Sequence, residues 1–200
     1  TGHTSTENAT GFAGGISVTT LTLEDAEEIL KNSNIEDAYS GLMSQELVAY
    51  QGEIIKSMLF GVSASFDSID KGKILQGRFF TDEEDQSLAR VAVLGSEVKE
   101  KLFGEGDAIG QTIKINKINY RVVGVMESRG SVMFFNWDKL VYLPVQTLQR
   151  KLMGIEHISF IFAQMKDPSQ GDRTVEEITA IVRERHGTTN DMDDDFAVMS

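Results

Sequence analysis

The chain contains 200 residues, of which 40% are hydrophobic and 25% charged, an ordinary balance for one globular domain or two small ones. Its 31 Asp and Glu residues outnumber its 19 Lys and Arg residues, and the formal net charge of -12 argues against binding to nucleic acid. The absence of cysteine excludes disulfides, thiol catalysis and thiolate metal sites.

The first residues of the chain differ in composition from the rest. Residues 1–15 are rich in Thr, Ser, Asn and Gly, which predicts a flexible leader. Because the chain opens on Thr1 instead of Met, we expect it to be a piece of a longer protein. The sequence contains no run of the ~20 apolar residues that a membrane-spanning helix requires.

The first predicted elements are a helix and a long hairpin. Thr22 and Asp25 fit a capping box, which marks the start of a helix. Residues 35–60 then have the composition of two strands, and Gln51 and Gly52 supply the turn between them. We therefore expect a β-hairpin of unusual length directly after the helix.

The middle of the chain has shorter elements. The continuous apolar run from Val91 to Leu94 predicts a short buried strand. The elements expected after it are a helix, a hairpin with its turn at Asn116-Lys117, a strand and a second helix, at 97–103, 111–126, 140–143 and 144–153.

The last third predicts a strand at 155–166, a helix at 173–185 and a final short strand at 196–199. Four aspartates lie between 191 and 195. They lack the glycine and the closing glutamate of a calcium-binding loop, so we interpret this run as a solvated loop that leads into the final strand.

No combination of residues predicts catalysis. The spacings HExxH, GxSxG and GxxxxGK[ST] are all missing. The three histidines are His3 in the leader, His157 in a predicted strand, and His186, whose positive charge suits a helix C-terminus. We therefore assign no catalytic, cofactor-binding or metal-binding residue.

One stretch, from Val132 to Trp137, concentrates large apolar side chains beside Gly130 and is bounded by Arg129 and Asp138. It can be a buried core segment, or it can be an exposed apolar loop that touches a partner or a ligand. In the second case the contact residues are Met133, Phe134, Phe135 and Trp137. Both interpretations stay open at this point.

A series of short motifs occurs along the chain. Each motif is weak by itself, but their order is specific. They are LTLEDAEEI at 21–29, GRFFT at 77–81, VAVLG at 91–95, LFG at 102–104, IGQTI at 109–113, YRVVGV at 120–125, VYLPV at 141–145, RHG at 185–187 and DDF at 194–196. This series resembles the periplasmic core domain of MacB-type ABC transporter permeases, a family that also includes lipoprotein-releasing and FtsX-like permeases.

The resemblance implies an α/β (α+β) fold with two lobes, inserted between the first and second transmembrane helices of a permease. A porter-like subdomain of strand-helix-strand units, nearest the membrane, would comprise residues 1–72 and 154–200. A smaller mixed α/β subdomain would be inserted at 73–153. The change in element spacing near residues 72 and 155 agrees with this division.

The resemblance also implies a non-catalytic, extracytoplasmic domain of a cell-membrane protein, on its periplasmic or extracellular side. It would couple cytoplasmic ATP hydrolysis to substrate export or release through mechanical movement. The implied partners are an ABC ATPase domain or subunit, a second permease copy and, in double-membrane organisms, a periplasmic adaptor. We expect the isolated domain to be monomeric or weakly dimeric. A permease of this kind is paired by its membrane helices and ATPase domains, which the isolated domain lacks, and two acidic copies repel each other.

Two other interpretations compete with this one. A secreted or periplasmic ligand-binding protein would use the apolar stretch to line a pocket. A hydrolase with scattered carboxylates ranks last because no paired catalytic motif exists.

Overall fold

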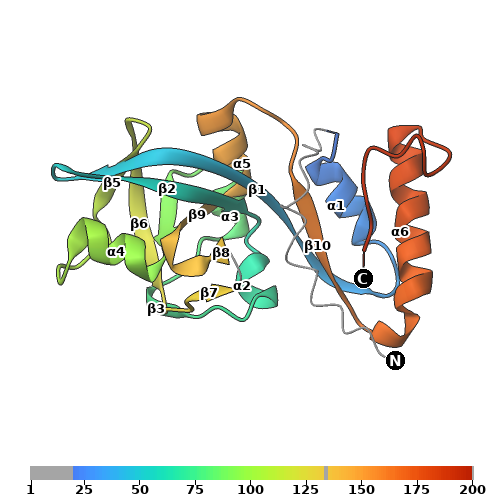
Figure 1. Ribbon diagram of the computed structural model, residues 1–200, viewed down its shortest axis with the longest axis horizontal. Helices are drawn as coiled ribbons and strands as arrows, with labels where there is room; N and C mark the ends of the chain where they lie inside the picture. The colour runs from blue at the N-terminus through green and yellow to red at the C-terminus, as the bar shows by residue number, and fades with distance from the viewer. Residues whose placement is uncertain (1–19, 133–134, 200) are drawn as a thin grey trace.

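The longest element of the chain is the hairpin of β1 (Ile35–Tyr50) and β2 (Glu53–Val62). In the computed structural model, which describes residues 20–132 and 135–199, this hairpin runs along the long axis of the molecule (Figure 1). Gln51 and Gly52 form its turn with φ of 45° and 92°, the left-handed conformation that a tight two-residue hairpin turn requires. The predicted hairpin and its turn are confirmed.

Eight strands form one mixed sheet. Besides the hairpin it contains β3 (Ile74–Gly77), β4 (Val91–Leu94), β5 (Thr112–Ile115), β6 (Ile118–Met126), β9 (Leu140–Pro144) and β10 (Phe160–Met165). The strand order is β10-β1-β2-β9-β4-β6-β3, and β5 pairs with both β1 and β6. The pairings therefore close a ring of six strands, β1-β2-β9-β4-β6-β5, from which β10 and β3 extend as edges.

Helices and short helical turns connect these strands. They are α1 (Leu23–Ile29), α2 (Phe66–Ile69), α3 (Asp82–Gln86), α4 (Ser96–Phe103), the 3-10 turn η1 (Trp137–Lys139), α5 (Val145–Thr147), the π-turn η2 (Leu148–Met153), the 3-10 turn η3 (Pro168–Gln170) and α6 (Gly171–His186). The capping box of α1 is confirmed, since the Asp25 carboxylate accepts a hydrogen bond from the Thr22 backbone N–H at 2.8 Å. Gly187, with φ of 69°, ends α6.

Two apolar cores lie on opposite faces of the sheet. Along β4, Ala92 and Leu94 belong to a core that α4 and α5 cover, whereas Val91 and Val93 belong to a second, aromatic-rich core. Because neighbouring residues of a strand point to opposite faces, a strand covered on both sides must be apolar throughout. This explains why the run 91–94 contains no polar residue.

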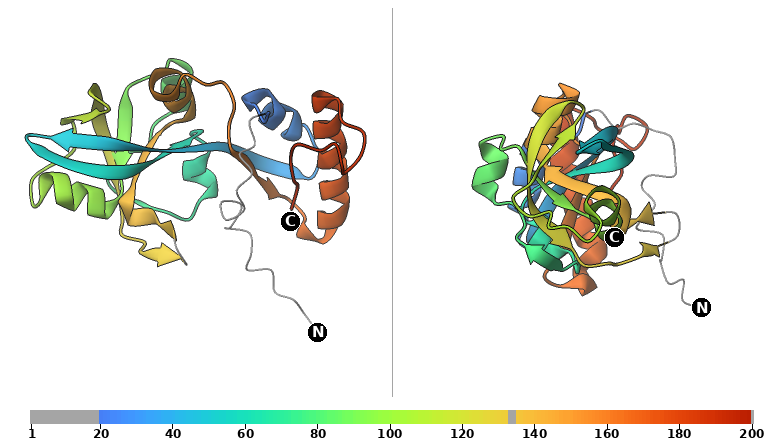
Figure 2. Two further views of the ribbon diagram at one scale, coloured as in Figure 1. Left: turned by 45° about the horizontal axis from the view of Figure 1, so that its top comes forward. Right: turned by 90° about the vertical axis from the view of Figure 1, so that its left-hand side faces the viewer.

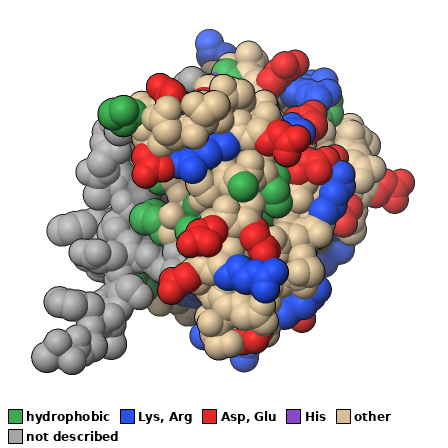
Figure 3. Space-filling view, turned by 90° about the vertical axis from the view of Figure 1, so that its right-hand side faces the viewer, with side chains coloured by type: hydrophobic (Ala, Val, Ile, Leu, Met, Phe, Trp, Pro, Cys, Tyr) green, Lys and Arg blue, Asp and Glu red, His purple; other side chains and the backbone are tan. Residues whose placement is uncertain are grey.

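A third apolar core lies at one end of the molecule. It consists of Ile29 from α1, Ile35 from β1, and Ile178 and Val182 from α6, with β10 packed against them. Figure 2 shows α1 and α6 next to each other at this end, where the chain also terminates. The outer surface of this end carries acidic and basic side chains in alternation, without a large patch of one sign (Figure 3).

β1 connects this end to the rest of the sheet. Its first part, up to Gly41, pairs with β10, and its remainder, from Gly41 to Tyr50, pairs with β2. Close to its end, Val48 and Ala49 also pair with β5. A single strand thus extends from β10 to the ring of six strands, and the division at 1–72, 73–153 and 154–200 stays a prediction.

Two predictions about the last third are corrected. The strand expected at 155–166 is confined to β10 (Phe160–Met165). The strand expected at 196–199 is wrong: this segment has no strand structure, and Phe196 and Val198 instead pack on the third core. An alternating apolar pattern needs a strand neighbour as well as a buried face, and here only the face is available. The predicted leader at 1–15 lies outside the described residues.

Candidate functional site

The apolar stretch singled out by the sequence forms a small hairpin. Its strands are β7 (Ser131–Val132) and β8 (Phe135–Asn136), paired as Ser131 with Asn136 and Val132 with Phe135. Of the four expected contact residues, Phe135 and Trp137 are half-buried, while Met133 and Phe134 lie outside the described residues. Phe135 and Trp137 pack against the aromatic-rich core, and the role of the stretch as a contact stays a prediction.

The base of the β7–β8 hairpin is anchored by aromatic packing. The ring centroids of Phe135 and Trp137 are 4.8 Å apart in an edge-to-face arrangement. They lie 6.4 Å and 6.3 Å, respectively, from the ring of Phe60 on β2. Aromatic pairs at such distances add about 0.5–1.5 kcal/mol to the effect of burial alone. Phe135 and Trp137 are therefore fixed to the sheet by their inner edges.

Arg129 clamps the same base from the other side. Its guanidinium carbon lies 4.1 Å from the centroid of the Trp137 ring, a cation–π geometry. The guanidinium also forms an ion pair with Asp70, which follows α2. The hairpin is thus joined both to the sheet and to the segment after α2.

Asp138 organises the turn that leads into the hairpin. Its carboxylate accepts hydrogen bonds from the Ser128 hydroxyl at 2.8 Å and from the backbone N–H groups of Arg129 and Gly130 at 2.7 Å and 2.9 Å. Burial raises the pKa of Asp138, but these hydrogen bonds outweigh burial and hold the pKa below its ordinary value. In the sequence, Asp138 stands out only as a boundary of the apolar stretch. Its hydrogen-bond partners lie eight to ten residues before it, a spacing that matches no recognisable motif.

The outer side of the hairpin is apolar and open. Val132 is 55% exposed and pairs with the half-buried Phe135 of β8. Leu47 and Ile54, which are also exposed, lie on the distal part of the β1–β2 hairpin. Apolar side chains that gather in one exposed patch mark surfaces that contact other proteins, whereas single ones are ordinary. Val132 lies in a different hairpin from Leu47 and Ile54, so the apolar contact that the β7–β8 hairpin offers is separate from theirs.

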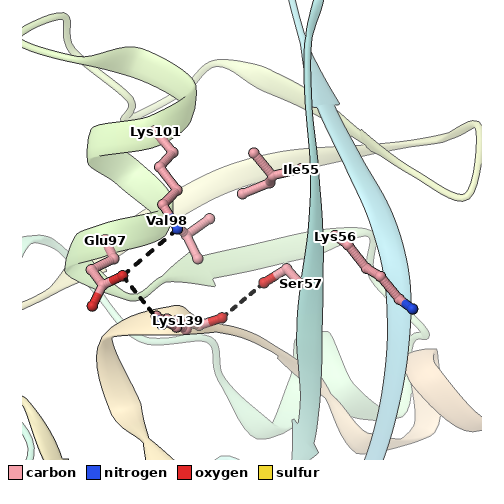
Figure 4. A pocket seen from close by; sticks show the side chains of 7 residues that line it. All are labelled: Ile55, Lys56, Ser57, Glu97, Val98, Lys101 and Lys139. Carbon is pink, nitrogen blue, oxygen red and sulfur yellow. Dashed lines mark hydrogen bonds and ion pairs between the residues drawn. The ribbon is translucent and has the colours of Figure 1, made fainter.

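The hollows on the described surface are small. The one in Figure 4 lies between α4 and β2 and has a cavity volume of about 40 Å³. Glu97 lines it and forms ion pairs with Lys101 at 3.7 Å and Lys139 at 4.0 Å. A second, lined by Thr22 and Arg150 among others, measures about 150 Å³. Small-molecule sites usually measure about 300–1,000 Å³. Neither hollow favours the ligand-binding interpretation.

Side chains of α6 bind part of the acidic run near the end of the chain. Arg183 binds Asp194 through Nε and Nη2 and also contacts Asp191. His186 contacts Asp195. The run is a loop in which Asp191 and Asp193 are exposed, as expected, but Asp194 and Asp195 bind α6 and no strand follows. Within 20–132 and 135–199, no group of three or more His, Asp or Glu side chains is arranged to hold a metal ion.

Comparison with known proteins decides the family. The family model of the MacB-like periplasmic core domain matches residues 2–181. The chain belongs to this family. It is accordingly the extracytoplasmic domain of a MacB-like ABC transporter permease, as the order of the short motifs indicated. No helix in the described ranges is both long and apolar enough to cross a membrane.

Among its relatives is a "Macrolide export ATP-binding/permease protein MacB" from Chlorobaculum tepidum, 31% identical over 90% of this chain. The protein of the same name from Bdellovibrio bacteriovorus is 28% identical over 83% of the chain. The chain spans 28% and 26% of the lengths of these two relatives. It therefore corresponds to about a quarter of such a protein.

Solved structures share its fold. The periplasmic region of MacB from Actinobacillus actinomycetemcomitans superimposes with a TM-score of 0.76, covering 85% of this chain and 76% of that one at 22% identity. The extracellular domain of the noncanonic ABC-type transporter YknZ from Gram-positive bacteria gives 0.75, covering 84% and 86% at 21% identity. The predicted mixed α/β fold of the MacB-like domain is confirmed.

Proposed function

We propose that this MacB-like domain transmits movement, coupling cytoplasmic ATP hydrolysis to substrate export or release. The observation that carries the proposal is the continuity of β1. Its 16 residues extend over about 50 Å, at about 3.3 Å per residue. One end of β1 packs beneath α1 and α6, and the other end lies in the six-stranded ring.

This continuity makes mechanical sense. A strand that is hydrogen-bonded to β10 at one end and to β2 and β5 at the other resists bending, because bending would break main-chain hydrogen bonds. A displacement applied where α1 and α6 lie would therefore reach the β7–β8 hairpin with little loss. The domain itself would perform no catalysis, and ATP would be hydrolysed by a separate domain or subunit.

The proposed partners follow from the relatives. Their names combine ATP binding and permease in one protein, which supports an ABC ATPase domain or subunit as a partner through membrane helices. A second permease copy and a periplasmic adaptor complete the assembly that we propose. The domain would lie on the periplasmic or extracellular side of the cell membrane.

We propose the β7–β8 hairpin as a contact with the adaptor or the substrate. Met133, Phe134, Phe135 and Trp137 are its expected residues. The exposure of Val132 supports this proposal, because Phe135 and Trp137 hold the base of the hairpin against the sheet. An apolar side chain on a backbone that is already fixed loses little conformational entropy on binding.

The transmission proposal is tested in the full-length transporter in lipid. The chain has no cysteine, so spin labels can be placed at Glu53→Cys, beside the turn of the long hairpin, and at Glu176→Cys, on the exposed face of α6. We expect the distance between these two labels to stay constant through the ATPase cycle, while the distance between the Glu53→Cys labels of two copies changes. A change in the distance within one copy would contradict the proposal.

The contact proposal is tested by Val132→Asp in the full-length transporter, with adaptor binding and export as readouts. We expect both to fall while the thermal stability of the domain is unchanged. The matched control is Ile54→Asp, an apolar-to-acid change at a similarly exposed position of the long hairpin. Equal losses in the two variants would show that the β7–β8 hairpin has no special role.

A further inference from the structure

The imidazole of His186, the last residue of α6, lies between two carboxylates. Its Nδ1 is 2.7 Å from Asp195 Oδ1, and its Nε2 is 3.1 Å from Asp25 Oδ2. The side chain is only 7% exposed. Two carboxylate oxygens can both accept a hydrogen bond only from a ring that carries both protons. The geometry therefore fits the imidazolium form.

Three segments that are distant in sequence meet at this ring. Asp25 belongs to the first turn of α1, His186 to the end of α6, and Asp195 to the C-terminal segment. The ring edge of Phe196 also packs on the imidazole, with centroids 5.6 Å apart. Where the described chain begins, Thr20 hydrogen-bonds to Asp195. The charged histidine thus connects the start and the end of the described chain.

The charged groups around the ring are unequal in how firmly they are held. Asp25 is almost fully buried, accepts a hydrogen bond from the Thr22 backbone and pairs with the Arg185 guanidinium. On α1, Glu24 and Glu28 add further negative charge beside Arg185. The Asp195 side chain is 35% exposed and can turn toward water. When the ring loses a proton, Asp195 is therefore the partner that separates.

The neighbouring ion pair does not depend on pH in this way. Arg183 binds Asp194 at 2.7 Å and holds the preceding part of the C-terminal segment to α6. Arginine keeps its charge at every pH at which proteins are folded. Charged contacts consequently hold the segment at two places, of which one is permanent and the other requires a proton, in addition to the packing of Phe196 and Val198 on the third core.

We propose that His186 is a pH-sensitive clasp, which fixes residues 195–198 to α1 and α6 when protonated and releases them when neutral. Release would change the direction in which the chain leaves the domain, while Arg183 keeps residues 191–194 in place. The proposal requires no movement of the sheet, because the partners of the ring found among the described residues are Asp25, Asp195 and Phe196, which lie on α1 and the C-terminal segment.

The sign of the effect follows from the two states of the ring. Burial lowers the pKa of His186, but the hydrogen bonds to Asp195 and Asp25 outweigh burial and raise the pKa above its ordinary value of 6.5. The clasp is therefore complete below pH 6.5 and is lost as the pH rises through the higher pKa of the folded state. The size of the effect depends on how far the pKa of His186 in the closed clasp exceeds its pKa in the open one. For each unit of that difference, full deprotonation lowers the closed-to-open ratio about tenfold.

The test combines two NMR measurements on the 200-residue chain. The pH titration of the His186 ring carbons should give a pKa above 6.5. Amide hydrogen-exchange protection factors, corrected for the intrinsic pH dependence of exchange, should fall for residues 195–198 between pH 6 and pH 9. In His186→Gln these factors should be independent of pH.

Two further variants separate the clasp from general stability. Asp195→Asn should lower the pKa of the His186 ring and abolish the pH dependence of protection without unfolding the domain, because Asp195 is partly exposed. Asp194→Asn should reduce protection at both pH values and preserve the pH dependence. His157→Gln, the same substitution on the connection before β10, should behave as the unaltered chain.

Either of two results would overturn the proposal. One is a His186 pKa below 6.5 in the unaltered chain. The other is the same pH dependence of protection at residues 195–198 in His186→Gln as in the unaltered chain.

Discussion

Replacement of Asp138 by alanine should destabilise the domain far more than the loss of an ordinary surface acid. The residue is 6% exposed, and its carboxylate is the acceptor for two backbone N–H groups and for the Ser128 hydroxyl. The hydroxyl can rotate to another acceptor, but the N–H groups of Arg129 and Gly130 cannot. A buried donor without an acceptor costs about 1–3 kcal/mol. The two together predict a loss of about 2–6 kcal/mol in the free energy of unfolding.

Urea unfolding followed by circular dichroism measures this loss as a shift in midpoint at constant slope. The matched control is Asp172→Ala, because Asp172 is exposed on the first turn of α6 and its loss should change stability by no more than about 0.5 kcal/mol. Asp138→Asn keeps one acceptor oxygen and should fall between the two. Equal midpoints for Asp138→Ala and Asp172→Ala would refute the reasoning.

The pH dependence of Asp138→Ala gives a second check. Since hydrogen bonding holds the pKa of Asp138 below 3.8, its contribution is complete above that value and is lost as the pH falls through the lower pKa of the folded state. The difference in stability between the unaltered chain and Asp138→Ala should therefore shrink below pH 3.8. A difference that grows in acid would show that the carboxylate is destabilising in its charged form.

Three other substitutions test the packing, and one measurement tests the assembly state. Leu59→Ala, at a position with no exposed surface, should lower the free energy of unfolding by about 2–5 kcal/mol in the same urea assay. Gly41→Ala places a Cβ 2.1 Å from Phe160 Cζ and should cost about 1–3 kcal/mol, most of which Phe160→Leu in the same chain should restore. Tyr120→Phe should raise the melting temperature, because the buried Tyr120 hydroxyl has no hydrogen-bond partner among the described residues. Sedimentation at micromolar concentration should show a monomer or a weak dimer, and a dimer that persists on dilution at low salt would contradict this.

Local features of the sequence were sufficient for most elements. A turn residue acts on its nearest neighbours, so Gln51-Gly52 and Asn116-Lys117 identified both hairpins, and the four positive φ angles at these residues confirm them. Thr22 and Asp25 act within one helical turn and identified the start of α1. The apolar run 91–94 indicated a buried strand but not which strands flank it. A strand buried on both faces shows no alternation of apolar and polar residues, so its sequence does not distinguish one face from the other.

Contacts between distant residues could not be predicted. β5 closes the ring of strands by pairing with β1, and β10 pairs with the start of the same strand, although neither pairing has a turn or a motif that records it. The strand wrongly expected at 196–199 failed for the same reason, because Phe196 and Val198 find a buried face without a neighbouring strand. Local propensity determines which elements a segment can form, whereas tertiary partners determine which of them it does form.

The polar residues of the site show the same limit more sharply. Asp138 and His186 were both assigned roles from their immediate neighbours, as a boundary and as a cation at the end of a helix. Their hydrogen-bond partners lie eight to 161 positions away, where no sequence pattern could pair them. A carboxylate or an imidazole acquires its function from the donors and acceptors that the fold brings within about 3 Å. In this domain the apolar pattern therefore predicts the scaffold. Asp138 and His186, whose partners are the least predictable from sequence, hold the turn at 128–130 and the C-terminal segment in place.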